Sequence, residues 1–219
     1  MKRLIGRIYK KIQKEVSFRL YKRTLYIPDD FRAVSFCFDD FPESALAGAR
    51  SLESINARGT FYTCFGLLAE DRCGGKIASR ESVLALAKNG HEIGCHTYDH
   101  TDCVDSPVRQ VEESCRKNIE SAKEHGVSLE NFAYPHGSIS VLAKRMLKKK
   151  YRTARGNIHD INRKVCDLYN LKAVPLYEET PPEKIEKMIG DVVSNGGWLI
   201  FYTHDVSDTP TQFGISEKS

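Results

Sequence analysis

From residue 31 onward the sequence alternates between short apolar runs and stretches with helical spacing that are bounded by turn residues. The short runs are rich in β-branched and aromatic residues, which is typical of buried strands. The expected strands are Ala33–Phe38, Thr60–Phe65, Glu92–Cys95, Asn131–Tyr134, Tyr151–Ala154, Leu171–Leu176 and Trp198–Thr203. This alternation predicts an α/β protein with a parallel sheet, either open or closed into a barrel.

Capping residues mark three of the helices between these strands. We expect one helix to run from Ser79 to about Gly90 and another from Ser106 to about Gly126. The third should begin at Pro181, because Thr180 can cap a helix and Glu183 would complete a capping box. No repeat or interdomain linker interrupts the pattern, so a single domain is expected over residues 28–219.

The first 23 residues carry the basic charge of the chain, with nine basic side chains and one acidic one. The whole chain has 33 basic and 29 acidic side chains, so the remainder is acidic and no nucleic-acid-binding domain is predicted. Ile8, Ile12, Val16 and Leu20 recur every four residues, which predicts a basic amphipathic helix over residues 1–27. Two interpretations stand: the apolar stripe packs on the domain, or residues 4–23 lie on an anionic membrane surface.

The seven cysteines are odd in number and form no C-x-x-C pair, which favours a reduced, cytoplasmic setting over a disulfide framework. No apolar run reaches the roughly 18 residues that a transmembrane helix needs. Basic residues at the N-terminus are not followed by the apolar run of an export signal. We therefore expect a cytoplasmic protein, with contact to a membrane surface as the open question.

Polar side chains follow several of the expected strands at the point where each strand ends. These residues are Asp39 and Asp40, His96 and His100, His136, Arg155, and His204. Because α/β barrels and open parallel sheets place their active sites at the carboxyl ends of strands, these side chains should converge on one face. The sequence therefore predicts one site assembled from distant segments.

A divalent metal ion is the expected centre of that site. His96 and His100 are four residues apart, and on one helical turn they would project toward the same ion. Asp40 would be the third ligand, leaving open positions for water and substrate as in catalytic zinc sites. Zinc suits this ligand set best, although cobalt or nickel could serve. A packing role for the histidine pair is the alternative explanation.

The neighbouring groups can transfer protons. Asp39, adjacent to a metal-binding Asp40, could take a proton from an attacking nucleophile, and His204 could give one to a leaving group. Each has an ordinary structural alternative, because aspartates are common in turns and a histidine can simply end a strand. The apolar residues Phe38 and Phe41 on either side of the aspartates weaken the turn explanation.

Together these stretches resemble the polysaccharide deacetylase family, the carbohydrate esterase group that includes the nodulation-type chitooligosaccharide deacetylases. Phe36–Pro42 is similar to its first motif, and His96–His100 matches its His-Ser/Thr-x-x-His metal motif. Phe132–Gly137 is similar to the third motif, and Gly59–Tyr62 to a strand of the family. With the strand that ends at His204, the resemblance covers about residues 31–213.

The resemblance implies a distorted (β/α) barrel of about seven parallel strands that removes acetyl groups from a carbohydrate. It implies that Asp39 is the catalytic base and His204 the general acid. The metal ligands would be Asp40, His96 and His100. The backbone N–H of His136 would stabilise the oxyanion. The expected substrate carries N-acetyl groups on an amino-sugar oligo- or polysaccharide, or on its precursor.

Three features depart from the family pattern. Ala133 stands where the third motif commonly has an arginine that orients the base, and Arg155 could supply that charge from the next strand end. His136 replaces the usual tyrosine. Only 15 residues follow His204, so the barrel is expected to be incomplete at the C-terminus, with an apolar face that the N-terminal helix or a second subunit would cover.

Two other functions remain open. The same metal centre could hydrolyse a small non-sugar amide, because function depends on the pocket and not on the fold. The chain could also be a truncated, non-catalytic relative that binds sugar. The presence of all five residues of the site, listed above as base, acid and ligands, argues against that second alternative.

Overall fold

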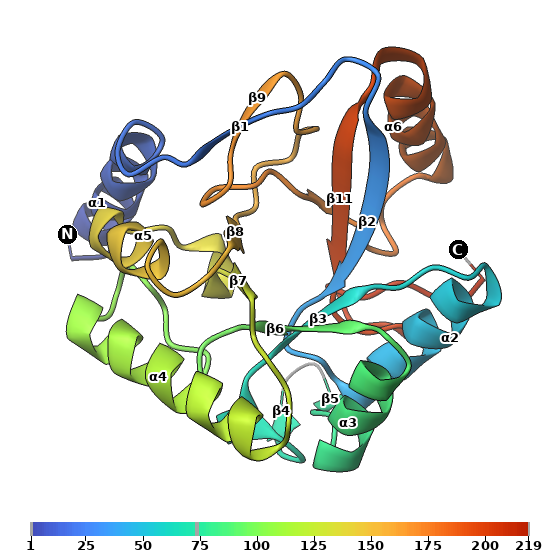
Figure 1. Ribbon diagram of the computed structural model, residues 1–219, viewed down its shortest axis with the longest axis horizontal. Coiled ribbons are helices and arrows are strands. Elements are labelled where there is room, and N and C mark those ends of the chain that lie inside the picture. Colours follow the sequence, from blue (N-terminus) through green and yellow to red (C-terminus); the bar gives the residue numbers. More distant parts are fainter. Residues whose placement is uncertain (1, 73–74, 219) are drawn as a thin grey trace.

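The computed structural model describes residues 2–72 and 75–218 (Figure 1). Its helices are α1 Lys2–Ser17, α2 Leu46–Ser54, α3 Arg80–Lys88, α4 Val108–Glu124, α5 Val141–Leu147 and α6 Pro182–Asn195. Its strands are β1 Thr24–Tyr26, β2 Arg32–Phe38, β3 Thr60–Thr63, β4 Asp71–Arg72, β5 Gly75–Lys76, β6 Glu92–Cys95, β7 Asn131–Ala133, β8 Thr153–Arg155, β9 Val165–Asp167, β10 Val174–Pro175 and β11 Gly197–Thr203. No described helix is long and apolar enough to cross a membrane.

Seven strands form one sheet in the order β10-β11-β2-β3-β6-β7-β8, and every neighbouring pair is parallel. The sheet curls strongly, as Figure 1 shows. Leu171, which precedes the edge strand β10, makes a parallel bridge with Arg155 at the end of β8, the strand at the opposite edge. One short segment thus connects the two edges, and the prediction of a distorted, incomplete (β/α) barrel with parallel strands is confirmed.

Side chains alternate between the two faces of this sheet, as the twofold period of a strand requires. Cys37, Tyr62 and Ile200 belong to a buried cluster on the concave side. Phe38 and Phe61, one position away in the same strands, stack with ring centroids 4.4 Å apart in the outer core. The helices cover this outer face: α6 packs against β11 and β2, and α3 and α4 pack against β6.

Most strand boundaries differ from the sequence prediction by one to three residues, and one predicted helix cap does not form. The fifth strand is β8, two residues later than expected, and the sixth shrinks to β10 because only Val174–Pro175 pair regularly with β11. The prediction of a capping box before α6 is wrong. Pro181 precedes the helix without a side-chain cap, and Thr180 Oγ1 instead accepts a hydrogen bond from Tyr177 N at 3.3 Å. The cap of Ser79 on α3 is confirmed.

The N-terminal helix is shorter than predicted. It ends at Ser17, and β1 pairs antiparallel with β9, so residues 2–26 contain a helix followed by a strand of the domain. The stripe of Ile8, Ile12, Val16 and Leu20 is exposed. The interpretation in which this stripe packs on the domain is therefore wrong, because polar contacts with α5 hold the helix instead.

The C-terminal segment after β11 folds back on the sheet. His204 N donates to Phe213 O at 3.1 Å, and Thr211 N donates to the Asp205 carboxylate at 2.8 Å. An apolar hollow of about 250 Å³ remains between this segment, α2 and the outer faces of β2 and β11. The N-terminal helix does not cover it, because α1 lies against α5 (Figure 1).

Candidate active site

A cavity of about 1030 Å³ opens at the carboxyl ends of the strands. It is lined by every residue that the sequence assigned to the site: Asp39, Asp40, His96, His100, His136, Arg155 and His204. The parallel sheet accounts for this convergence, because each of these residues comes at or just after the end of a strand. The predicted assembly of one site from distant segments is what the structure contains.

Left-handed backbone conformations direct several of these side chains into the cavity. Asp40, Thr97, His100 and His136 have φ angles of 61°, 63°, 58° and 57°. Such angles are costly for residues with a Cβ and cluster at functional sites. They also correct one expectation: His96 and His100 are not on a helical turn, and two left-handed residues in an irregular loop bring their rings together.

Asp40 and the two histidines form a compact group that could hold a metal ion. Asp40 Oδ1 lies 3.5 Å from His96 Nε2 and 3.3 Å from His100 Nε2. Ligand atoms at roughly 2.1 Å from a tetrahedral zinc ion lie about 3.4 Å apart, so these spacings fit one ion. Among the described residues, this is the group of acidic, histidine and cysteine side chains close enough together to hold a metal.

The protonation states of the histidines support the same conclusion. His96 Nδ1 lies 2.9 Å from the Ala133 carbonyl oxygen, which can only accept, so Nδ1 carries the proton and Nε2 presents a lone pair. Burial lowers the pKa of His96 to about 4, and burial together with nearby His136 lowers the pKa of His100 to about 4. His96 in this tautomer has no proton on Nε2 to give Asp40 Oδ1, which is buried without a hydrogen bond. The residues present therefore fit a divalent cation.

The loop that carries His100 is held by its own polar network. The Asp99 carboxylate accepts hydrogen bonds from Ser114 Oγ at 2.6 Å and from Thr101 Oγ1. Tyr98 N donates to Ser114 Oγ at 2.9 Å, and Thr101 N donates to Thr97 Oγ1 at 2.8 Å. This network ties the loop to α4 and fixes the position of the second histidine.

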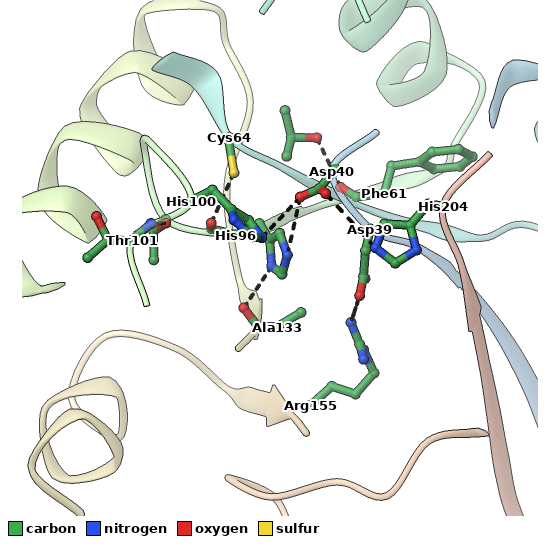
Figure 2. Close-up of polar contacts among 12 residues, drawn as sticks. Asp39, Asp40, Phe61, Cys64, His96, His100, Thr101, Ala133, Arg155 and His204 are labelled. Carbon is green, nitrogen blue, oxygen red and sulfur yellow. Dashed lines mark hydrogen bonds and ion pairs between the residues drawn. The ribbon is translucent and has the colours of Figure 1, made fainter. Parts of the chain in front are cut away.

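Asp39 lies beside Asp40 but has different surroundings. It is buried, and both of its carboxylate oxygens accept hydrogen bonds from Arg155 Nη2, the second at 2.6 Å. Figure 2 shows the arginine and the two histidines approaching the aspartate pair from different directions. Burial by itself raises the pKa of the Asp39 carboxyl, but Arg155 and, to a smaller extent, His96 and His204 offset this and leave the pKa below its usual value. Asp39 is therefore ionised at neutral pH and can accept a proton.

Arg155 places beside Asp39 the charge that Ala133 cannot provide. Its guanidinium stacks between Tyr62 and Tyr202, with ring centroids 5.2 and 4.8 Å away, and its Nη1 donates to Gly156 O at 3.1 Å. Ala133 contributes only its carbonyl, which orients His96. A positive charge from β8 thus reaches the Asp39 carboxylate.

His204 lies next to Asp40, and His136 lies next to His100. The His204 ring packs against Phe213 and Tyr177, with centroids 5.4 and 6.4 Å away, and its Nε2 is 3.9 Å from Asp40 Oδ2. Its Nδ1 is buried without a hydrogen-bond partner. His136 is exposed, and its ring meets the His100 ring edge-on at 4.5 Å.

Several lining residues were not identified from the sequence. Tyr177, Phe213 and the hairpin residues Asp71 and Arg72 border the cavity. They lie in loops without motif or spacing, so only the tertiary structure brings them to the site. Asp99 had a usable signal, because it lies inside the histidine motif.

Three solved structures have similar folds. IcaB from Ammonifex degensii superposes with a TM-score of 0.62 at 20% identity, over 84% of this chain and 88% of the other. The deacetylase PplD of Streptococcus pyogenes, solved with acetate, gives 0.60 at 14% identity over 71% and 69%. A polysaccharide deacetylase from Bacillus cereus gives 0.57 at 19% identity over 70% and 50%, so this chain spans about half its length. At these identities the likeness concerns the fold.

No curated protein matches this sequence. The family model described as polysaccharide deacetylase, by contrast, matches residues 27–154. That match includes the aspartate pair, both histidines and β7, and it covers more than half of the chain. The chain therefore belongs to the polysaccharide deacetylase family.

Proposed function

We propose that this protein is a metal-dependent hydrolase that removes acetyl groups, chiefly N-acetyl groups, from an amino-sugar-containing oligo- or polysaccharide or its precursor. The observation that carries the proposal is the contrast inside the aspartate pair. Asp39 is neutralised by Arg155, whereas Asp40 Oδ1 faces two neutral histidines with no hydrogen bond. An ionised base beside a group of residues that can hold a cation is what metal-assisted hydrolysis needs.

Asp40, His96 and His100 would hold the cation, most plausibly zinc, with cobalt or nickel as substitutes. Such an ion would polarise the acetyl carbonyl and make an adjacent water molecule more acidic. Asp39 would accept the proton of that water as its oxygen attacks the carbonyl carbon. Arg155 keeps the carboxylate ionised and fixes its direction. The backbone N–H of His136 would donate to the oxyanion that develops.

His204 would complete the reaction. As the C–N bond breaks, it would protonate the leaving amine, so that acetate and a free amino sugar are released. Its ring is held by Phe213 and Tyr177 at the rim of the cavity, on the Asp39 side of the cluster in Figure 2. Acetate takes the water oxygen, and Asp39 and His204 exchange protons with solvent before the next cycle.

The dimensions of the cavity favour a carbohydrate over a small amide. A volume of about 1030 Å³ is at the upper end of the range for ligand pockets, and aromatic side chains line part of its wall. Sugar rings pack their C–H faces on aromatic surfaces, so Tyr177 and Phe213 would suit residues next to the acetylated one.

The test measures acetate release from N-acetylated chitooligosaccharides by the full chain, first stripped of metal and then supplied with zinc, cobalt or nickel. A panel of small amides and ureides is run in parallel. We expect hydrolysis of the sugars that depends on added metal, and Asp30→Asn, on an exposed residue away from the site, should leave it unchanged. Hydrolysis of small amides alone would identify the second class of substrate, and metal binding without any turnover would refute the enzymatic proposal.

A further inference from the structure

The N-terminal helix is fixed to the domain by its polar face. Lys144 Nζ, fully buried, donates to Ser17 O at 2.6 Å and also pairs with Asp167. Val141 N donates to Gln13 Oε1 at 3.1 Å, and Lys148 Nζ donates to Lys22 O at 2.9 Å. These bonds attach the N-terminal segment to α5 and its C-terminal end through polar groups.

Four large apolar residues of the helix and of the turn that follows it face outward. Ile8, Ile12, Val16 and Leu20 are 51, 53, 38 and 44% exposed, and we call them the α1 stripe. Tyr9, next to the stripe, and Leu142, at the start of α5, are 50 and 55% exposed. Large apolar side chains gathered in this way are unusual on a surface that meets only water.

The charge around the α1 stripe indicates what covers it. The exposed basic residues in the same segment are Lys11, Arg19, Lys22 and Arg23, and Glu15 is the one acidic residue among the first 23. A helix with an apolar face and a surplus of cations has the features of helices that lie in the interface of an anionic bilayer. A second copy of the same basic segment would instead be repelled.

The contacts with α5 also orient the helix relative to the active site. Gln13, Ser17 and Lys22 meet residues of α5 in ascending order, so α1 and α5 run in the same direction. The helix α5 begins four residues after Gly137, which lines the cavity. Residues 2–12 therefore continue for roughly 16 Å past the start of α5, on the side to which the strand ends point.

We infer that the α1 stripe docks this protein on an anionic lipid surface and holds the rim of the active site next to that surface. The headgroups attract the basic side chains, and the stripe enters the boundary between headgroups and acyl chains. The position of the rim has a consequence that rests on the proposed deacetylation. An acetylated amino sugar carried on a lipid would be presented directly to the cavity.

Sedimentation of the full chain with vesicles tests the inference. One set contains phosphatidylcholine alone, and the other contains phosphatidylcholine with phosphatidylglycerol. We expect binding to the anionic set only, weakened by added salt. The double variant Ile12→Glu/Val16→Glu should lower the partition coefficient at least about tenfold.

The double variant Ile55→Glu/Val193→Glu is the matched control. Ile55, at the end of α2, is 71% exposed, and Val193, on α6, is 61% exposed. The substitutions remove the same two side-chain types as in the α1 variant and add the same charge. The control variant should bind vesicles like the unchanged protein. Equal losses of binding in both variants, or no binding of the unchanged protein to anionic vesicles, would overturn the inference. So would light scattering that shows a dimer of the unchanged protein, if the dimer does not bind vesicles and only the α1 variant is monomeric.

An activity arm separates this inference from the proposed function. The α1 variant should hydrolyse a soluble N-acetylated oligosaccharide at the normal rate, but a lipid-anchored N-acetylglucosaminyl group in anionic vesicles at least about tenfold more slowly. If the α1 variant and the unchanged protein hydrolysed the lipid-anchored group at equal rates, the idea that docking presents the substrate to the cavity would be overturned. If neither substrate is hydrolysed, the proposed function fails, and the sedimentation result still decides the docking.

Discussion

Asp39 and Asp40 are neighbours in the sequence, yet the two halves of the site around them have opposite electrostatic designs. The Asp39 half contains its own cation, because Arg155 fills the space between Tyr62, Tyr202 and the carboxylate. The Asp40 half contains neutral histidines and a buried oxygen that no donor reaches. The Asp39 carboxylate has its counter-cation within the folded chain, whereas Asp40 faces two histidines with which it could hold an ion from solution. The neighbours of each carboxylate thus give the same residue type different surroundings, which suit the two roles proposed for them.

The largest effect should come from Asp39→Asn. The amide keeps the shape of the carboxylate and one acceptor for Arg155, but it cannot take a proton, so kcat for deacetylation should fall about 10²- to 10⁴-fold. Metal content, measured by elemental analysis after loading, should be unchanged. If the variant turned over normally, Asp39 would not be the base, and the two halves would differ in packing alone.

Replacing Arg155 by Met should destabilise the protein by about 3–5 kcal/mol, because it leaves a buried carboxylate without its partner. Denaturant unfolding measures the loss. Arg116→Met, which breaks exposed ion pairs with Glu113 and Glu120, is the control and should have little effect. A small loss at Arg155 would mean that Asp39 is less dependent on its partner than its burial indicates.

The same Arg155→Met variant gives a pH test. In the unchanged protein the pKa of Asp39 is lowered, so its contribution to stability is present above the unfolded pKa and is lost as the pH falls through the folded one. Without Arg155, burial raises the pKa of Asp39. The cost of burying its unpaired charge should then disappear on acidification, because the carboxyl becomes neutral. The stability difference between the two proteins should therefore be largest at neutral pH and shrink toward pH of about 4. A stability difference that does not change with pH would mean that Arg155→Met destabilises the protein through lost packing and not through the charge of Asp39.

Asp40→Asn should separate binding from stability. Losing a charged ligand should weaken zinc affinity at least about 100-fold in calorimetry, more than typical losses for groups that only orient ligands. In the metal-free protein the same change should leave the unfolding midpoint unchanged or raise it slightly, since it removes the charge of a half-buried carboxylate whose buried oxygen has no donor. A clear loss of stability without metal would show that the carboxylate has a structural partner.

The smallest effect should come from the aromatic ring over Arg155. Tyr202→Leu removes the ring whose centroid is 4.8 Å from the guanidinium and should lower stability by about 1 kcal/mol. Tyr202→Phe keeps the ring and should retain most of the stability. Equal losses in both would assign the effect to the hydroxyl group.

The strand and helix alternation identified the fold because burial on both faces gives parallel strands a distinct apolar signature. The ends were less certain: β10 is reduced to two residues, and the cap expected at Thr180 does not form because its hydroxyl bonds to Tyr177 N. The helices α2 and α5 escaped prediction. The first has a Gly and two Ser among its nine residues, and the second has only seven residues, so both patterns are weak.

By itself, the sequence determined the class of fold and the set of side chains at the strand ends, because residue type and spacing carry that information locally. The tertiary structure decided how those side chains are used. The pairing of Asp39 with Arg155, 116 positions away, follows from the curl of the sheet. The convergence of His96 and His100 follows from left-handed residues in a loop rather than from a helical turn. The exposure of the α1 stripe follows from buried Lys144, whose bond to Ser17 O turns the polar face of the helix inward. Contacts between distant segments depend on the whole packed chain, and no local pattern records them.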